Sequence, residues 1–366
     1  MRRADQGLRP PGGSILTPME PERPWSTRPR GPALAAAAAV LAAAAVLAWW
    51  RMPPDPVREL RAHDAPLARV EREAAPDLGP RVERWRLVSA AGDTATALWR
   101  GASSTARAPW TVVLLGGLQT GERAALLLPE GPFNALAVDW PWRGPRRMTA
   151  WQVVTRIGAI QDAVLRTPGV LARGVEAAAR QAGVDTTRIA LLGASLGVPP
   201  ALAALRLTRA PAALVLVDGA ADLRALLAAG LERQGLHPAV AVPLAALAAR
   251  LVHPLEPALH APAAARLPVL LVNVEHDELL PAGAVRRLHQ ALPRAEIRWR
   301  AGRHLRPQRQ ETIRELTQEV LAWLTALGAD PPALVRDGAR GHAGLRTVRI
   351  SPDPPQAEGA PPARVR

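Results

Sequence analysis

The sequence predicts an α/β fold in which a mostly parallel sheet is flanked by helices. Two short segments, residues 82–88 and 94–99, are joined by Ala-Gly-Asp, as in a β-hairpin. Near-continuous apolar runs follow, as expected for parallel strands that are buried on both faces. Helical patterns separate these runs, and strands that alternate with helices are typical of a parallel sheet between helical layers.

The predicted elements follow one another in a regular order. The apolar runs that predict the inner strands are residues 111–115, 133–139, 188–192, 213–217 and 269–274. A last run, residues 295–299, is more polar, which fits a strand at the edge of the sheet. The helical patterns cover residues 121–128, 150–181, 198–208, 223–250, 282–292 and 308–327.

The composition changes on both sides of this region. Residues 1–32 and 329–366 are rich in Pro, Gly and Arg, so we expect a disordered basic leader and a disordered tail. Residues 51–80 are punctuated by Pro and predict a linker. The folded domain is therefore expected over residues 81–328.

Residues 33–50 form a stretch without a charged side chain, in which 11 residues are Ala and the last two are Trp49 and Trp50. About 18 apolar residues are the threshold for a transmembrane helix, and Trp and Arg favour its interfacial ends. We therefore predict a single-pass membrane anchor, with a cytoplasmic N-terminus and an extracytoplasmic domain. Two alternatives remain open, a cleaved signal sequence that would release a secreted protein and a soluble Ala-rich helix.

The composition argues against several classes of function. The chain of 366 residues has a formal net charge of +14, and it contains no Cys, no Lys and no Tyr. The lack of Cys excludes disulfides, Cys-ligated zinc and a Cys nucleophile. The excess charge lies partly in the two tails and is elsewhere interleaved with acids, as around Arg69 and Glu71. Nucleic-acid binding needs a concentrated basic face, so we do not expect it.

One motif carries chemistry. An apolar run leads directly into Gly193-Ala-Ser195-Leu-Gly197, and a helical pattern follows. This G-x-S-x-G sequence is typical of a nucleophile elbow, in which small residues allow a tight turn that exposes the serine hydroxyl. With 7 Ser and 28 Gly in the chain, a chance match in the correct strand-to-helix context is rare.

Over residues 80–328 the sequence resembles the α/β-hydrolase superfamily, which orders its catalytic groups as Ser, acid and His. The resemblance implies Ser195 as the nucleophile, Asp277 after a late apolar run as the acid, and His304 before the last helix as the base. Asp218, which ends the preceding run, is an alternative acid, and Glu275 and Glu278 also compete with Asp277.

The resemblance also implies an oxyanion hole made of backbone N–H groups. One donor is expected at Leu196, after the nucleophile, and the other at Gly117 or Leu118, after the first apolar run. Families of this fold often carry His-Gly in that loop, whereas this chain has Gly-Gly-Leu. Pro199 and Pro200 follow the elbow, and proline is tolerated there because N–H groups in the first turn of a helix lack intrahelical partners.

Residues 219–266 are rich in Ala and Leu and contain several Pro residues. In this fold an insertion at that point is commonly a lid, which here predicts an apolar acyl or alkyl side to the site; a structural pair of helices is the alternative. No cluster of Cys and His indicates a metal, and no cofactor is expected.

Together these observations predict a membrane-anchored serine hydrolase that cleaves a carboxylic ester or related acyl bond of a small molecule. Thioesterase, lactonase and peptidase activity would use the same acyl-transfer chemistry. An inactive hydrolase-fold protein that binds a ligand or partner is the alternative from another class.

Overall fold

The computed structural model describes residues 55–103, 109–118, 120–145, 148 and 150–329. The predicted leader and membrane segment lie outside these residues, and so does the predicted tail beyond its first residue. Within the described residues, no single helix has both the length and the hydropathy to cross a membrane. The helix pair Pro238–Leu251 and His253–Ala264 meets both criteria together, with a bend of 77° between its halves.

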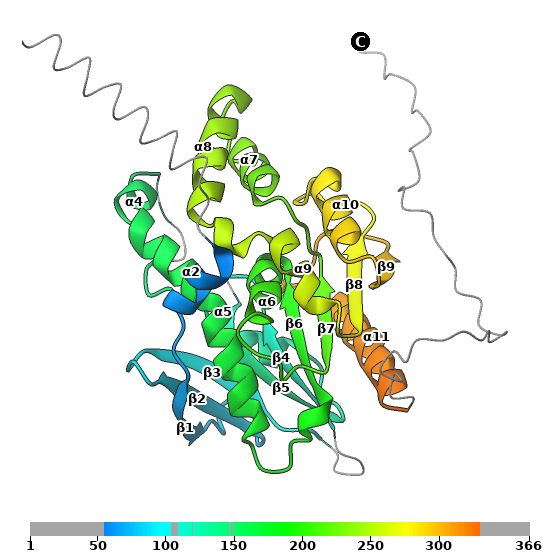
Figure 1. The fold of residues 1–366 in the computed structure, drawn as a ribbon. Coiled ribbons are helices and arrows are strands. Elements are labelled where there is room, and N and C mark those ends of the chain that lie inside the picture. Colours follow the sequence, from blue (N-terminus) through cyan, green and yellow to red (C-terminus); the bar gives the residue numbers. More distant parts are fainter. Residues whose placement is uncertain (1–54, 104–108, 119, 146–147, 149, 330–366) are drawn as a thin grey trace, which may run out of the picture. The chain divides into compact units, whose positions relative to one another are not determined.

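The described residues form one sheet of nine strands in the order β1-β2-β3-β5-β4-β6-β7-β8-β9 (Figure 1). The strands β1 to β3 pair antiparallel, β3 pairs antiparallel with β5, and every pair from β5 to β9 is parallel. The hairpin and the parallel strands predicted from the sequence are thus confirmed. The strands are β1 (Leu67–Ala74), β2 (Val82–Ser89), β3 (Thr94–Arg100), β4 (Trp110–Leu115), β5 (Phe133–Val138), β6 (Ile189–Ala194), β7 (Ala213–Val217), β8 (Val269–Val274) and β9 (Glu296–Arg300).

Helices cover both faces of this sheet. One core contains residues of α5, α6, α9 and α10, and the other contains residues of α3 and α11. The helices are α2 (Pro56–Ala62), α3 (Ala124–Leu127), α4 (Ala150–Thr155), α5 (Ile157–Ala179), α6 (Val198–Ala204), α7 (Leu223–Arg233), α8 (Pro238–Leu251), α9 (Pro257–Ala264), α10 (Ala282–Ala291) and α11 (Gln310–Ala329).

Strand β6 shows how the sequence fills the two cores. Successive side chains of a strand point to opposite faces, so Ile189 and Leu191 enter the first core, whereas Ala190 and Leu192 face the second. Because both faces are covered, every position is apolar, and the period-two alternation of a half-exposed strand is absent.

The linker predicted over residues 51–80 is corrected by the structure, because α2 and β1 lie within it. Asp55 caps α2 by accepting hydrogen bonds from the backbone N–H groups of Val57 and Arg58. Leu60, Leu67 and Ala75 are buried, whereas many of the other side chains of this segment are charged and at least partly exposed. An amphipathic edge strand with few apolar residues gives a weak sequence signal, which explains the missed elements.

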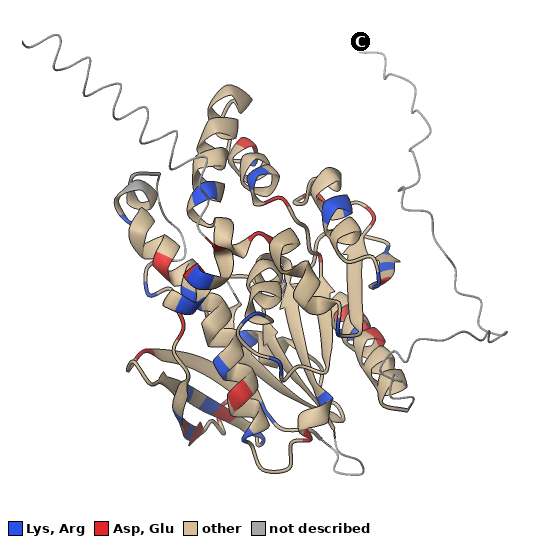
Figure 2. Ribbon diagram, viewed as in Figure 1, with Lys and Arg blue, Asp and Glu red and all other residues tan. Residues whose placement is uncertain are grey.

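Charges of both signs are interleaved on the described part of the chain (Figure 2). On the outer strands, for example, Glu71 pairs with Arg69 of the same strand and with Arg86 of β2. Exposed pairs of this kind contribute little to stability and indicate a solvated surface.

The single helical pattern predicted over residues 223–250 is divided into α7 and α8. Gly235, with φ of +91°, and Pro238 at the start of α8 account for the break. The two helices pack against each other beyond the carboxyl ends of the strands (Figure 1). In contrast, α9 packs on α6 and α10 and contributes buried side chains to the first core.

Candidate active site

Ser195 lies in the turn between β6 and α6, where a short 3-10 helix covers Ser195–Gly197. Its φ of +53° is in the left-handed region, which costs a non-glycine residue about 1–2 kcal/mol and is typical of a functional turn. A Cβ at Gly193 would lie 2.7 Å from Ala201 Cβ, and one at Gly197 would lie 2.2 Å from the Leu115 carbonyl oxygen. Both glycines of the motif are therefore required by close packing.

The two prolines after the elbow fit the helix that follows. Pro199 and Pro200 occupy the first turn of α6 and are buried. Their missing N–H groups leave no intrahelical bond unmade, which agrees with the tolerance expected from the sequence.

His304 follows β9 after a turn at Gly302, whose φ is +115°. The His304 side chain is almost fully buried, and its Nε2 lies 2.8 Å from Ser195 Oγ. Its Nδ1 lies 2.7 Å from Asp277 Oδ2. A carboxylate only accepts hydrogen bonds, so Nδ1 carries the proton and Nε2 is free to accept the serine hydroxyl. Ser195, His304 and Asp277 thus form one continuous hydrogen-bonded chain.

Two carboxylates flank the imidazole, but they differ in their partners. Asp277 directs Oδ1 to the backbone N–H groups of Leu279 and Leu280, at 2.7 and 2.9 Å, which leaves Oδ2 for His304. Asp218 is 2% exposed, and its Oδ2 lies 3.8 Å from His304 Nδ1, beyond hydrogen-bond distance. That oxygen accepts instead from the backbone N–H of Leu305, at 2.7 Å.

The surroundings shift the pKa values of these groups. Burial alone would lower the pKa of His304, but the hydrogen bond and charge of Asp277, together with the charges of Asp218 and Glu278, outweigh it and raise the pKa above its usual value. Burial raises the pKa of Asp218, against the opposing effects of the Leu305 N–H and His304. The site therefore stabilises an imidazolium.

Glu278 holds the loop of His304. Its Oε2 accepts the backbone N–H of His304 at 3.1 Å, and its Oε1 pairs with Arg306 at 3.0 Å and with Arg303 at 3.5 Å. Hydrogen bonds from its own backbone N–H and from His304, with the two guanidinium groups, lower the pKa of Glu278 to about 2 despite some desolvation. The sequence suggested Glu278 only as a competing acid, and nothing in its spacing indicated this positioning contact. The other competitor, Glu275, is exposed.

Comparisons with known proteins agree with this architecture. No protein-family model and no curated protein matches the sequence. Among solved structures, a puromycin-hydrolyzing peptidase from Mycobacterium tuberculosis is similar over 69% of this chain, with 18% identity and a TM-score of 0.51. A puromycin hydrolase is similar over 72% of this chain, with 18% identity and a TM-score of 0.50. The chain has the α/β-hydrolase fold.

The similarity covers only part of the larger neighbours. This chain spans 40% and 41% of the peptidase and of the puromycin hydrolase, respectively. An esterase from Pyrococcus furiosus is matched over 97% of its own length and 72% of this chain, with 17% identity and a TM-score of 0.48. At these identities the comparisons concern the fold, and the chemistry has to be argued from the site.

The loop after β4 completes the mouth of the site in this α/β-hydrolase fold. Gly117 and Leu118, suggested for the oxyanion hole, line the same cavity as Ser195 and Leu196. The Trp140 indole Nε1 donates to the Gly116 carbonyl oxygen at 3.0 Å, and this hydrogen bond holds the loop after β4 in place. Sequence reasoning missed Trp140; its position two residues after the end of β5 was the available signal.

A hydroxyl gives the same loop a second support. Thr120 Oγ1 donates to the Gly117 carbonyl oxygen at 2.8 Å, and the backbone N–H groups of Thr120 and Gly121 reach the same oxygen. The carbonyl of Gly117 is thereby directed into its own turn. This local network forms without the His-Gly sequence that proteins of this fold often carry here.

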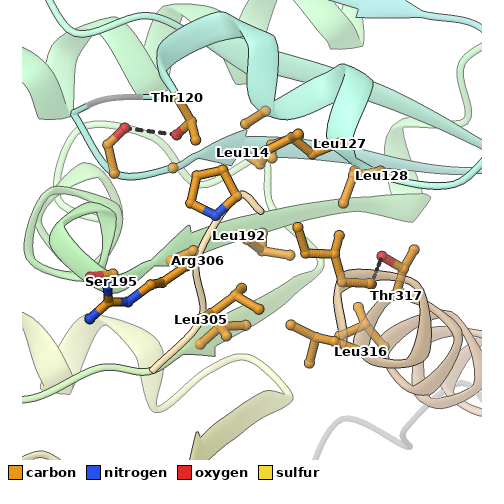
Figure 3. Close-up of a pocket in the computed structure, with 18 of the residues that line it drawn as sticks. Leu114, Thr120, Leu127, Leu128, Leu192, Ser195, Leu305, Arg306, Leu316 and Thr317 are labelled. Carbon is orange, nitrogen blue, oxygen red and sulfur yellow. Dashed lines mark hydrogen bonds between the residues drawn. The ribbon is translucent and has the colours of Figure 1, made fainter. Parts of the chain in front are cut away.

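A cavity of about 580 Å³ opens at Ser195 and His304 and extends between the sheet and α11 (Figure 3). Side chains of β4, β6, α3 and α11 line its inner part, and most of them are apolar. None of the lining residues belongs to the segment 219–266 that the sequence suggested as a lid. The apolar side of the site thus comes from the second core of the fold.

Asp218, Asp277 and His304 each have a potential metal-ligand atom, and these atoms lie within 4.8 Å of one another. In this structure His304 Nδ1 pairs with Asp277 Oδ2, and Asp218 Oδ2 accepts from the N–H of Leu305. These hydrogen bonds account for the close approach of the three side chains.

Proposed function

We propose that this protein is a serine hydrolase that cleaves carboxylic esters or related acyl bonds through an acyl-enzyme on Ser195. The observation that carries the proposal is the hydrogen-bonded chain from Ser195 Oγ through His304 to Asp277, at 2.8 and 2.7 Å. A serine hydroxyl is a weak nucleophile by itself and needs such an adjacent, oriented base.

In the first step, Ser195 Oγ attacks the carbonyl carbon as its proton passes to His304 Nε2. An Oγ–C bond forms, and the carbonyl π electrons move to the oxygen. Asp277 holds the imidazole in the required tautomer and stabilises the imidazolium, in agreement with the raised pKa of His304. We assign stabilisation of the oxyanion to the backbone N–H of Leu196 and to that of Gly117 or Leu118.

In the second step, the tetrahedral intermediate collapses and the bond from carbon to the leaving oxygen breaks. The leaving group takes the proton from His304 Nε2 and departs as an alcohol. Water then attacks the acyl-enzyme with His304 again as base, which releases the carboxylic acid and restores the Ser195 hydroxyl.

Labelling with a fluorophosphonate probe tests this proposal. The full-length protein should be labelled, Ser195→Ala should take no label, and His304→Ala should react at least about 100-fold more slowly because its nucleophile lacks a base. Exposed Ser103 offers a matched control, since Ser103→Ala should label like the wild type. A folded wild-type protein that takes no label would overturn the proposal and favour a binding role. A panel of ester, thioester, lactone and amide substrates then separates the related activities.

We also propose that residues 33–50 anchor the chain in a membrane, with the hydrolase domain on the extracytoplasmic side. The support is the uncharged run that ends in Trp49 and Trp50. After alkaline extraction, the full-length chain should stay in the membrane fraction, and a form without residues 1–51 should not. Full-length protein in the soluble fraction would refute the anchor, and a shortened N-terminus by mass spectrometry would indicate a cleaved signal sequence.

The lack of Cys makes the orientation directly testable. A single Cys introduced by Ala91→Cys, in the exposed hairpin turn, should react with a membrane-impermeant maleimide on intact cells. A Cys introduced by Thr27→Cys, in the leader, should react only after lysis. The opposite pattern would reverse the proposed orientation.

A further inference from the structure

The cavity at Ser195 runs along the strands of the sheet, beneath α11. In the pairing of β4 with its neighbours, Leu115 lies beside Gly193, two residues before the nucleophile, and Trp110 lies beside Phe133. Along β4, Leu115 and Trp110 are five residues apart, which corresponds to about 17 Å. Ser195, Leu114, Val112 and Phe133 all line the cavity, so it extends along much of β4.

The chemistry of the walls changes along this path. Polar side chains that line the cavity gather at its mouth, where Ser195, His304 and Arg306 lie. Figure 3 shows Ser195 and Arg306 on one side of the view and the side chains of Leu128, Leu316 and Thr317 on the other. The Thr317 hydroxyl donates its proton to the Ile313 carbonyl oxygen at 2.7 Å, so it cannot donate to a ligand. The inner cavity is therefore lined mainly by apolar side chains.

The inner end of the cavity is fixed by a buried arginine. Arg100 donates to the carbonyl oxygens of Leu128 and Pro129, at 2.6 and 2.8 Å, and its guanidinium lies 5.4 Å from the centre of the Phe133 ring. The side chains of Phe133 and Leu128 therefore form a supported floor. A cavity with a fixed floor limits the length of the ligand that enters it.

An apolar cavity beside the nucleophile suits the part of a substrate that stays bound during catalysis. In an acyl transfer to Ser195, the acyl group remains attached until water releases it, whereas the leaving group must depart first. Each further methylene that is buried strengthens binding about fourfold, so an apolar cavity of this depth selects for length.

From these observations we propose that the cavity binds the hydrocarbon chain of a medium- or long-chain acyl group, with its carbonyl carbon at Ser195 Oγ and its methyl end toward Phe133 and Leu128. The orientation of the chain rests on the hydrolase function proposed above. Binding of the hydrocarbon itself does not, so the two can fail separately.

Hydrolysis of a chain-length series tests the substrate class. The full-length protein is assayed with p-nitrophenyl esters from acetate to palmitate, and kcat/KM should rise at least about tenfold from acetate to an optimum at medium or long chains. Val112→Phe places a ring in the middle of the cavity and should lower kcat/KM for the long esters at least about tenfold more than for acetate. Phe133→Ala should move the optimum to longer chains.

Two further variants guard against misfolding and unspecific effects. Val320→Phe narrows the cavity from the opposite wall and should reproduce the loss seen with Val112→Phe. Ala322→Phe adds the same ring to the exposed face of α11, outside the cavity, and should leave the chain-length profile unchanged. Equal preference for acetate and dodecanoate in the wild type would overturn the proposal, and so would a profile that is insensitive to both cavity variants.

Two comparisons separate the remaining possibilities. If dodecyl acetate is cleaved faster than ethyl dodecanoate, the chain belongs to the alcohol and the acyl assignment is wrong. Titration of Ser195→Ala with dodecanoic acid, followed by calorimetry, measures binding without catalysis. Binding that weakens at least about tenfold on adding Val112→Phe supports the hydrocarbon site even if no ester is cleaved, and no binding to Ser195→Ala would overturn it.

Discussion

Asp218 and Asp277 stand at the ends of the neighbouring strands β7 and β8, and the side chains of both are almost completely buried beside His304. Only Asp277 is hydrogen-bonded to the imidazole, at 2.7 Å, whereas Asp218 remains at 3.8 Å. The difference comes from the adjoining loops. The Asp277 loop provides N–H groups for one carboxylate oxygen and leaves the other free, whereas the oxygen of Asp218 nearest to His304 is occupied by Leu305.

This comparison indicates how a site with two acids divides their roles. Asp277 orients the imidazole through a bond, and Asp218 acts on it through charge and through the backbone of the next residue. Both acids favour the charged imidazolium, but only one fixes its tautomer. Substitutions that remove charge and keep shape can separate these contributions.

The largest effect is expected for Asp277→Asn. An amide at this position favours the wrong tautomer of His304, so kcat/KM for an ester substrate should fall about 10³–10⁴-fold with the fold intact. Steady-state kinetics and circular dichroism check this prediction. A fall of less than tenfold would show that Asp218 can replace Asp277, and the distinction drawn above would be wrong.

A smaller loss is expected for Asp218→Asn. The amide oxygen can still accept the N–H of Leu305, so the variant removes chiefly a charge at 3.8 Å from His304, and kcat/KM should fall about three- to tenfold. Asp218→Ala, which also removes the acceptor of Leu305, should cost more. Equal losses in the two variants would show that the hydrogen bond to Leu305 is unimportant.

The pH dependence of kcat/KM sharpens the comparison further. His304 must be neutral to accept the serine proton, and its raised pKa places the acidic limb of the profile above the usual value of 6.5 for histidine. Activity should therefore be lost as the pH falls through this limb. Asp218→Asn removes one of the charges that raise the pKa, so the limb should move to lower pH. A limb that stays in place would show that Asp218 does not act on His304 through its charge.

The smallest effect is expected for Glu278→Gln, because Glu278 holds the backbone of His304 and does not contact the imidazole nitrogens. The amide oxygen can still accept the N–H of His304, but the ion pairs with Arg303 and Arg306 are lost. We expect kcat/KM to fall about two- to fivefold and the acidic limb of its pH profile to move to lower pH. Glu275→Gln, at an exposed position three residues earlier, is the matched control and should have no effect. A tenfold or larger fall in kcat/KM for Glu278→Gln would show that Glu278 contributes as much to activity as Asp218.

Much of this arrangement follows from local sequence. Parallel strands that are buried on both faces are mostly apolar, so β4 to β8 were predictable without the structure. The Ser195 turn was predictable as well, because only glycine fits at Gly193 and Gly197. Features of this kind depend on a few neighbouring residues, so a short stretch of sequence is enough to predict them.

Features that depend on distant segments could not be predicted in the same way. The choice between Asp218 and Asp277 depends on which loop supplies N–H groups, and the support of the Gly116 loop by Trp140 joins residues 24 positions apart. The apolar side of the site was expected in residues 219–266, whereas the cavity lies between the sheet and α11. Strand β1 was missed because its outward side chains are charged.

The close packing of the turn at Ser195 has a consequence for how the proposed hydrolase can evolve. A side chain at Gly197 would meet the Leu115 carbonyl oxygen at 2.2 Å, so this part of the site admits no variation. Leu316 and Val320 line the cavity from α11, away from this turn. New substrate preferences should therefore arise by exchange of residues on the last helix of the fold, while the reacting groups and their turn stay fixed.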